Sequence, residues 1–299
     1  MQQYGNLELL ARQVVEGFIT GLHNSPNHGF SVEFAEHKPY NRGMNIRNID
    51  WKLFARSNKL FVKQFEEETN LRCRILLDVS GSMQYPQETQ GKLKFATLAS
   101  AAICNMLKKQ RDAYGLTTFN NGLLEHSQLK SNDRHYVNIL GQLDKYWTGS
   151  LKNEIPNETK NLSSMLNYIA STSPKRSLII ILSDMLDENA QDPELWQALQ
   201  HLKHGKNELI LFHLQDTSTE VNLNFDSREY RFEHLETGEK LVLNPSEIRQ
   251  AYSKEAKAFY KTIQEKCLSY NIDHYPINVA EDFNQLLLTF YQKRRRMQR

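Results

Sequence analysis

The sequence predicts an α/β protein in which a doubly wound, mostly parallel sheet follows an N-terminal helix and a small β subdomain. Two observations predict the sheet. From about residue 70 onward, short apolar stretches alternate with longer amphipathic ones, as successive strand–helix units require. Residues 178–182 are apolar at every position, which is typical of a parallel strand covered on both faces. We therefore expect residues 178–182 at the centre of the sheet.

The first 69 residues have a different pattern and are predicted to form a separate N-terminal part. Leu7, Leu10, Val14 and Phe18 recur at three- and four-residue steps, which predicts an amphipathic helix over residues 6–21. Alternating apolar residues and a polar turn follow this helix. The elements expected there are strands at 30–34 and 59–65 and a turn at 41–43.

Residues 70–299 are predicted to form the α/β domain. The Asn-Asn-Gly triplet at 120–122 predicts a hairpin turn that returns residues 123–126 as an antiparallel edge strand. A second hairpin, inserted at about 229–243, is predicted because two apolar stretches flank Glu-Thr-Gly-Glu. The other expected strands are 73–77, 113–119, 208–214 and 272–277, and the expected helices are 93–109, 134–146, 162–171, 193–202, 246–268 and 281–293.

The charge balance, the cysteine spacing and the length of the apolar runs exclude several classes of protein. The 37 Lys and Arg residues nearly balance the 35 Asp and Glu residues, so we expect no nucleic-acid partner. Cys73, Cys104 and Cys267 are spaced like neither a disulfide framework nor a zinc site, which predicts buried thiols in a reducing compartment. No apolar run is long enough to span a bilayer, and we expect a cytoplasmic protein. The basic run 293–296 is typical of a solvated terminus.

Polar side chains follow two of the predicted strands. Asp78, Ser80 and Ser82 come directly after one strand, and Asp184 follows another. Since ligands of open α/β sheets bind beyond the carboxyl ends of the strands, we expect these side chains to converge. Their donors are all hard oxygens, which suit Mg²⁺ or Mn²⁺ rather than zinc. The alternative is that these residues only cap helices and form turns.

Residues 74–83 resemble the first motif of the metal-ion-dependent adhesion site (MIDAS) of the von Willebrand factor A fold. The upstream segments at 40–43, 49–51, 55–56, 59–63 and 66–68 are similar to the DUF58 family of bacterial and archaeal proteins. The resemblance implies a threonine ligand, which Thr159 supplies, and a second aspartate, which is Asp184. It also implies roles: hydroxyls of Ser80, Ser82 and Thr159 contact the metal, while Asp78 and Asp184 act directly or through water.

The resemblance further implies a non-enzymatic, Mg²⁺-dependent protein-binding module. A partner protein would supply an acidic residue to the metal. The expected partner is a MoxR-type AAA+ ATPase, with the chain acting as an adaptor in the assembly or maturation of protein complexes. One residue departs from the family pattern, because Met44 follows Gly43 where the family usually has an acid.

Two other hypotheses stay open. One is a metal-dependent hydrolase acting on phosphate esters, although Ser80 stands where haloacid-dehalogenase-like phosphatases have a second acid. The chain also has no phosphate-binding glycine loop and no Gly-x-Ser-x-Gly motif, so we name no catalytic residue. The other is a structural α/β protein with a vestigial site that binds no divalent ion.

Overall fold

The chain divides by its internal contacts into two compact units. One contains residues 1–16 and 70–297, and the other contains residues 17–69. The computed structural model describes residues 5–23, 37–40, 51–63, 71–86, 91–120, 122–150, 162–185, 192–233, 238–281 and 283–297.

The N-terminal elements are short apart from the first helix. Helix α1 (Gly5–His23) buries Leu7, Ala11 and Val15, close to the apolar face that the periodicity predicts. In the second unit, strands β1 (His37–Pro39) and β2 (Phe61–Lys63) pair antiparallel. Helix α2 (Trp51–Ser57), which the sequence analysis did not predict, has no buried residue. The expected strand at 30–34 and the turn at 41–43 lie outside the described residues.

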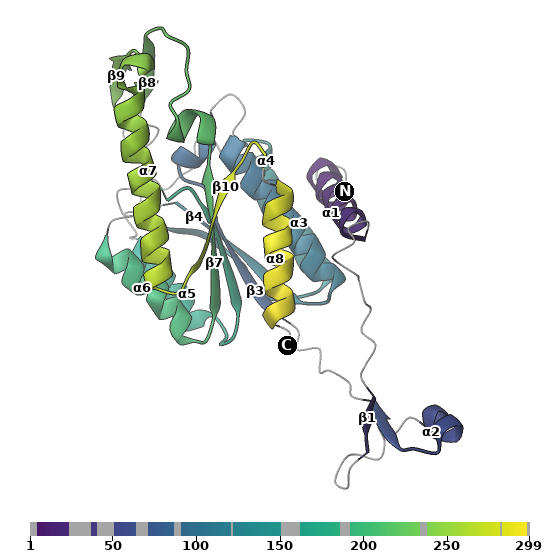
Figure 1. The fold of residues 1–299 in the computed structure, drawn as a ribbon. Helices are drawn as coiled ribbons and strands as arrows, with labels where there is room; N and C mark the ends of the chain where they lie inside the picture. Colours follow the sequence, from purple (N-terminus) through teal and green to yellow (C-terminus); the bar gives the residue numbers. More distant parts are fainter. Residues whose placement is uncertain are drawn as a thin grey trace. The chain divides into compact units, whose positions relative to one another are not determined.

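The larger unit contains a six-stranded sheet (Figure 1), and its strand order is β10-β7-β6-β3-β4-β5. All neighbouring pairs are parallel except β4 and β5, which are antiparallel, as the turn at 120–122 predicts. The six residues of β6 are all buried, and β6 and β3 form the central pair, so the predicted sheet is confirmed. The strands are β3 (Arg72–Asp78), β4 (Ala113–Phe119), β5 (Leu123–His126), β6 (Leu178–Ser183), β7 (Glu208–Gln215) and β10 (Asp273–Asn278).

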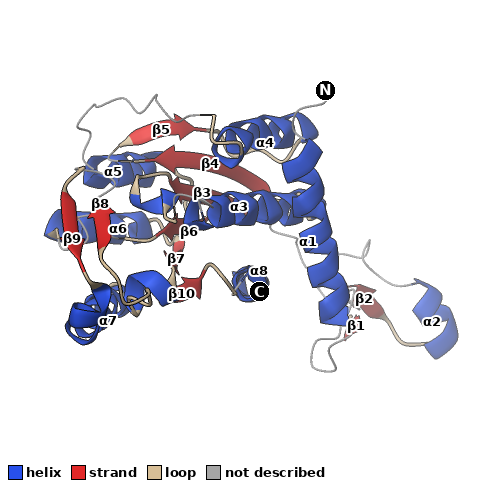
Figure 2. Ribbon diagram, turned by 90° about the horizontal axis from the view of Figure 1, so that it is seen from above, coloured by secondary structure: helices blue, strands red, loops and turns tan. Residues whose placement is uncertain are grey.

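Helices cover both faces of the sheet (Figure 2). On one face, an apolar cluster joins α5, α6 and α7 to the strands. On the other face, α3 contacts both α4 and α8, and its alanines allow close packing on the strands. The helices are α3 (Gly91–Lys109), α4 (Asp133–Trp147), α5 (Leu162–Thr172), α6 (Pro193–His204), α7 (Pro245–Ser269) and α8 (Phe283–Met297).

The predicted inserted hairpin is present as strands β8 (Tyr230–Glu233) and β9 (Lys240–Leu243). Its Leu241 and Val242 are exposed. The three cysteines are free and buried, and burial raises the pKa of each thiol. Among the helices in the described ranges, none combines the length and apolar character needed to cross a membrane.

The C-terminal basic run is partly structural, which differs from the solvated terminus that its composition predicts. Arg294 is only 6% exposed, and its Nε donates to Asp112 Oδ2 at 2.6 Å. Asp112 Oδ1 accepts a hydrogen bond from the Leu71 N–H at 3.0 Å. Because Leu71 and Asp112 directly precede β3 and β4, this ion pair ties helix α8 to the amino end of the sheet.

We expect Arg294→Ala to lower the free energy of unfolding by about 3 kcal/mol or more, because the substitution leaves the Asp112 carboxylate buried without its guanidinium partner. Urea unfolding followed by circular dichroism measures this change. Arg295→Ala, on the exposed side of the same helix, is the control and should change stability by less than about 0.5 kcal/mol. Equal losses in the two variants would contradict a buried structural ion pair.

Candidate metal site

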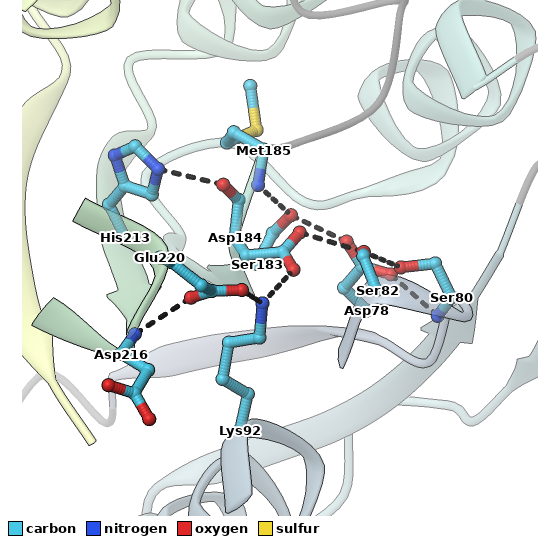
Figure 3. Close-up of polar contacts among 10 residues, drawn as sticks. All are labelled: Asp78, Ser80, Ser82, Lys92, Ser183, Asp184, Met185, His213, Asp216 and Glu220. Atoms are coloured by element: carbon cyan, nitrogen blue, oxygen red, sulfur yellow. Dashed lines mark hydrogen bonds and ion pairs between the residues drawn. The ribbon is translucent and has the colours of Figure 1, made fainter. Parts of the chain in front are cut away.

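The candidate site lies where two central strands end side by side. Strands β3 and β6 pair in parallel, with Leu77 opposite Leu182. The next residue of β3 is Asp78, and β6 continues into Ser183 and Asp184. The sequence therefore brings two carboxylates from positions 106 residues apart to one edge of the sheet (Figure 3).

Asp78 is held by hydrogen bonds to both of its carboxylate oxygens. Its Oδ1 accepts from the Ser80 N–H at 2.9 Å, and its Oδ2 accepts from the Ser183 hydroxyl at 2.5 Å. The side chain is buried, and burial together with the nearby charge of Asp184 raises its pKa to about 7. A cation at this edge would favour the ionised form of Asp78.

The two serines connect Asp78 to Asp184. After Asp78 the chain turns into a short 3₁₀ helix, Ser82–Gln84, which places the Ser80 and Ser82 hydroxyl oxygens 3.0 Å apart. The Ser82 hydroxyl donates to Asp184 Oδ1 at 3.1 Å. Four of the five predicted ligands thus lie together, and Thr159 lies outside the described residues, as does Met44.

Lys92, in the first turn of α3, reaches the same carboxylate from the other side (Figure 3). Its ammonium is fully buried and donates to Asp184 Oδ2 at 2.7 Å and to Glu220 Oε1. Burial alone would lower the pKa of Lys92, but the charges of Asp184 and Glu220 outweigh it and raise the pKa. Lys92 is therefore a charged group at neutral pH.

Glu220 lies on a short π-helix, Thr217–Val221, just beyond the carboxyl end of β7. Its second oxygen, Oε2, accepts from the Asp216 N–H at 2.8 Å. Burial raises the pKa of Glu220, although the ammonium of Lys92 opposes that shift. Glu220 thus adds a third carboxylate to the neighbourhood of the site.

A histidine pair supports the backbone at Asp184. His213 Nε2 lies 2.8 Å from the Asp184 carbonyl oxygen, and His213 Nδ1 lies 3.0 Å from His274 Nε2. Burial, reinforced by His274, lowers the pKa of His213 to about 4, so the ring is neutral at neutral pH. Since a carbonyl oxygen only accepts, the proton of neutral His213 is on Nε2, and His274 Nε2 donates to His213 Nδ1. These bonds fix the position of Asp184.

The residues fit a hard divalent cation such as Mg²⁺. The donors are carboxylate and hydroxyl oxygens, and the ammonium of Lys92 already lies against Asp184, so the carboxylates stabilise positive charge at this edge. The described ranges contain no group of three or more His, Cys, Asp and Glu side chains arranged to hold a metal. Among the described residues, the groups that could hold a metal here are two carboxylates and two serine hydroxyls, and water would complete its coordination.

Sequence reasoning missed Lys92, Ser183 and Glu220. Ser183 is the last residue of β6, and Glu220 lies shortly after β7, so the strand-end rule that selects Asp78 could have selected them too. Lys92 is not at the end of a strand, so that rule could not select it. It occupies the first turn of an amphipathic helix, where a lysine is usually solvated.

Residues 36–261, more than half of the chain, match the family described as "Protein of unknown function DUF58". Uncharacterized proteins of Mycobacterium bovis and Mycobacterium tuberculosis are 22% identical to the chain over 180 residues. That match covers 60% of this chain and 55% of each relative, so the chain spans about half the length of these curated relatives.

Among solved structures, the chain is similar to the conserved hypothetical protein BatB from Bacteroides thetaiotaomicron. The sequence identity is 13% and the TM-score is 0.44, over 74% of this chain and 99% of that chain. It is also similar to a von Willebrand factor type A structure from Catenulispora acidiphila. There the identity is 18% and the TM-score is 0.36, over 49% of this chain and 34% of that chain.

The pKa of Asp78 predicts how the metal-free protein responds to pH. A folded-state pKa raised from 3.8 to about 7 means that the folded protein binds this proton more tightly than the unfolded chain. In EDTA, we therefore expect this residue's contribution to the free energy of unfolding to fall as pH rises from about 4 to 7. Chemical unfolding of wild type and Asp78→Asn at pH 5, 6, 7 and 8 isolates the contribution.

Asp78→Asn should be more stable than wild type at pH 8 in EDTA, and this advantage should shrink toward pH 5. A stability difference that is the same at every pH would contradict the raised pKa.

Proposed function

Because the chain belongs to the DUF58 family, and because four predicted ligands meet at one sheet edge, we propose that it is a non-enzymatic, divalent-metal-dependent protein-binding module. Asp78, Ser80, Ser82 and Asp184 would hold the metal, with Thr159 as a further ligand. The observation that carries the proposal is the continuous set of hard oxygens that runs from Asp78 through the two serines to Asp184.

The ligand chemistry supports binding of an acidic group. When bound, Mg²⁺ or Mn²⁺ would supply a Lewis-acidic position that a carboxylate of a partner protein can occupy. The serine hydroxyls are neutral donors, and both Asp78 oxygens accept hydrogen bonds from Ser80 and Ser183. Neutral donors and hydrogen-bonded carboxylates leave a metal more electrophilic than a cage of free carboxylates would.

Two basic side chains beside the site are already engaged, which supports binding over hydrolysis. A hydrolase needs a base near the metal-bound water. Lys92 is protonated between two carboxylates, and His213 presents its Nε2 proton to the Asp184 carbonyl. Neither is a free base, and we accordingly propose no catalytic residue.

The partner that we propose is a MoxR-type AAA+ ATPase, for which the chain would act as an adaptor in the assembly or maturation of protein complexes. The choice of an ATPase follows from the family resemblance of the sequence, and the chemistry of the site supports a partner that supplies an acidic residue. The acidic residue would come from the ATPase or from the complex on which the ATPase acts.

We expect a native-lysate pull-down with the wild-type chain and Mg²⁺ to retain a partner, and Ser82→Ala and Asp78→Ala to lower the retained amount by about tenfold or more. Each substitution removes a predicted donor. EDTA should have the same effect on the wild-type chain. Mass spectrometry identifies the retained protein and quantifies it in every lane.

Asp226→Ala, which removes a carboxylate outside the site, is the control and should retain the partner in full. Circular dichroism establishes that each variant is folded. If the same proteins are retained with Mg²⁺, with EDTA and by all variants, metal-dependent binding is wrong for those partners. Phosphate-ester hydrolysis by the wild-type chain that Asp78→Ala abolishes would favour the hydrolase instead.

A further inference from the structure

A lysine contacts the carboxylate that the metal would need. Asp184 Oδ1 accepts from Ser82, and Asp184 Oδ2 accepts from the Lys92 ammonium at 2.7 Å. Lys92 has no exposed surface, so water does not compensate its charge. In the metal-free protein, Asp184 therefore has a cationic partner that belongs to the chain itself.

The ammonium lies between two carboxylates that are anchored independently (Figure 3). The backbone at Asp184 is fixed by His213, which is on β7. Glu220 is fixed by the Asp216 N–H within the π-helix that follows β7. Because Glu220 is held separately, Lys92 keeps one carboxylate partner even when Asp184 turns toward another cation.

We propose that Lys92 is a resident counter-cation that competes with the divalent metal for Asp184, and that Glu220 retains the Lys92 ammonium when the metal binds. The inference rests on the proposed function and describes how metal affinity is set at that same site. Lys92 and Glu220 are positioning residues, since neither is a predicted metal ligand.

The charges at the site predict whether each substitution strengthens or weakens Mg²⁺ binding. Asp78, Asp184 and Glu220 contribute three negative charges when ionised, and Lys92 contributes one positive charge. Removing Lys92 leaves the site more negative and removes the ammonium that competes with the metal for Asp184 Oδ2, so Mg²⁺ should bind more tightly. Removing the charge of Glu220 leaves Asp184 as the main partner of Lys92, so Mg²⁺ should bind more weakly. The two substitutions thus have opposite expected signs.

Isothermal titration calorimetry with MgCl₂ tests the proposal on the full chain. We expect Lys92→Met to lower the Kd for Mg²⁺ by about tenfold or more, and Glu220→Gln to raise it by about threefold or more. Lys94→Met is the matched control, because it removes a lysine two residues away on the same helix, and it should change Kd by less than about twofold.

Lys92→Met removes the ammonium that contacts the buried Asp184 and the partly buried Glu220, so its folding needs a separate measurement. Thermal unfolding in EDTA and in excess MgCl₂ should show a larger Mg²⁺-dependent rise in Tm for Lys92→Met than for wild type. If Lys92→Met folds in neither buffer, the sign of the Glu220→Gln change decides: weaker Mg²⁺ binding supports the proposal, and equal or tighter binding overturns it.

Shifts of Kd in the same direction for both variants, or no shift in either, would show that Lys92 and Glu220 are only structural. If Mg²⁺ affinities follow the expected pattern but no partner is retained in the pull-down, the proposed function fails and this inference stands. If Lys92→Met binds Mg²⁺ and wild type does not, the proposed metal-dependent function of the wild-type chain also fails, and the inference that Lys92 competes with the metal stands. If neither protein binds Mg²⁺, both proposals are wrong.

Discussion

The parallel pairing of β3 with β6 is the constraint on which the rest of the site depends. Parallel strands end at the same edge, so the register that places Leu77 opposite Leu182 also places Asp78 beside Ser183 and Asp184. The apolar residues of both strands are buried between two layers of helices, which fixes this register. The hydrogen bonds at Asp78 and between Ser82 and Asp184 then follow from two short loops.

Two like charges at one buried edge would repel each other, and the fold offsets this repulsion locally. Asp78 does so through its raised pKa and its bonds to Ser80 and Ser183. Asp184 does so through the ammonium of Lys92, which comes from a helix on one face of the sheet. The edge therefore combines a carboxylate that is stabilised by hydrogen bonds with one that is stabilised by an internal cation.

The alternation of apolar and amphipathic stretches was enough to predict the sheet, its antiparallel edge and the inserted hairpin, because burial on two faces dictates those patterns. It also predicted Asp78, Ser80, Ser82 and Asp184 as neighbours. Lys92 and Arg294 could not be predicted. A lysine or arginine on an amphipathic helix is expected to be exposed to solvent. Only the tertiary packing shows that each of these two is buried against a carboxylate. Helix α2 was missed because its seven residues are too few to establish a helical period in the sequence.

The two ends of the sheet have different roles, and the ion pair between Arg294 and Asp112 lies at only one of them. It closes the amino end, where Leu71 and Asp112 lead into β3 and β4, whereas the candidate metal site occupies the carboxyl end. Strand β3 thus connects an end that anchors the C-terminal helix to an end that carries a predicted metal ligand. Residue changes at the ligand end can alter what the protein recognises while the anchoring end keeps the domain folded, so recognition can diverge among homologous chains at little cost to the scaffold.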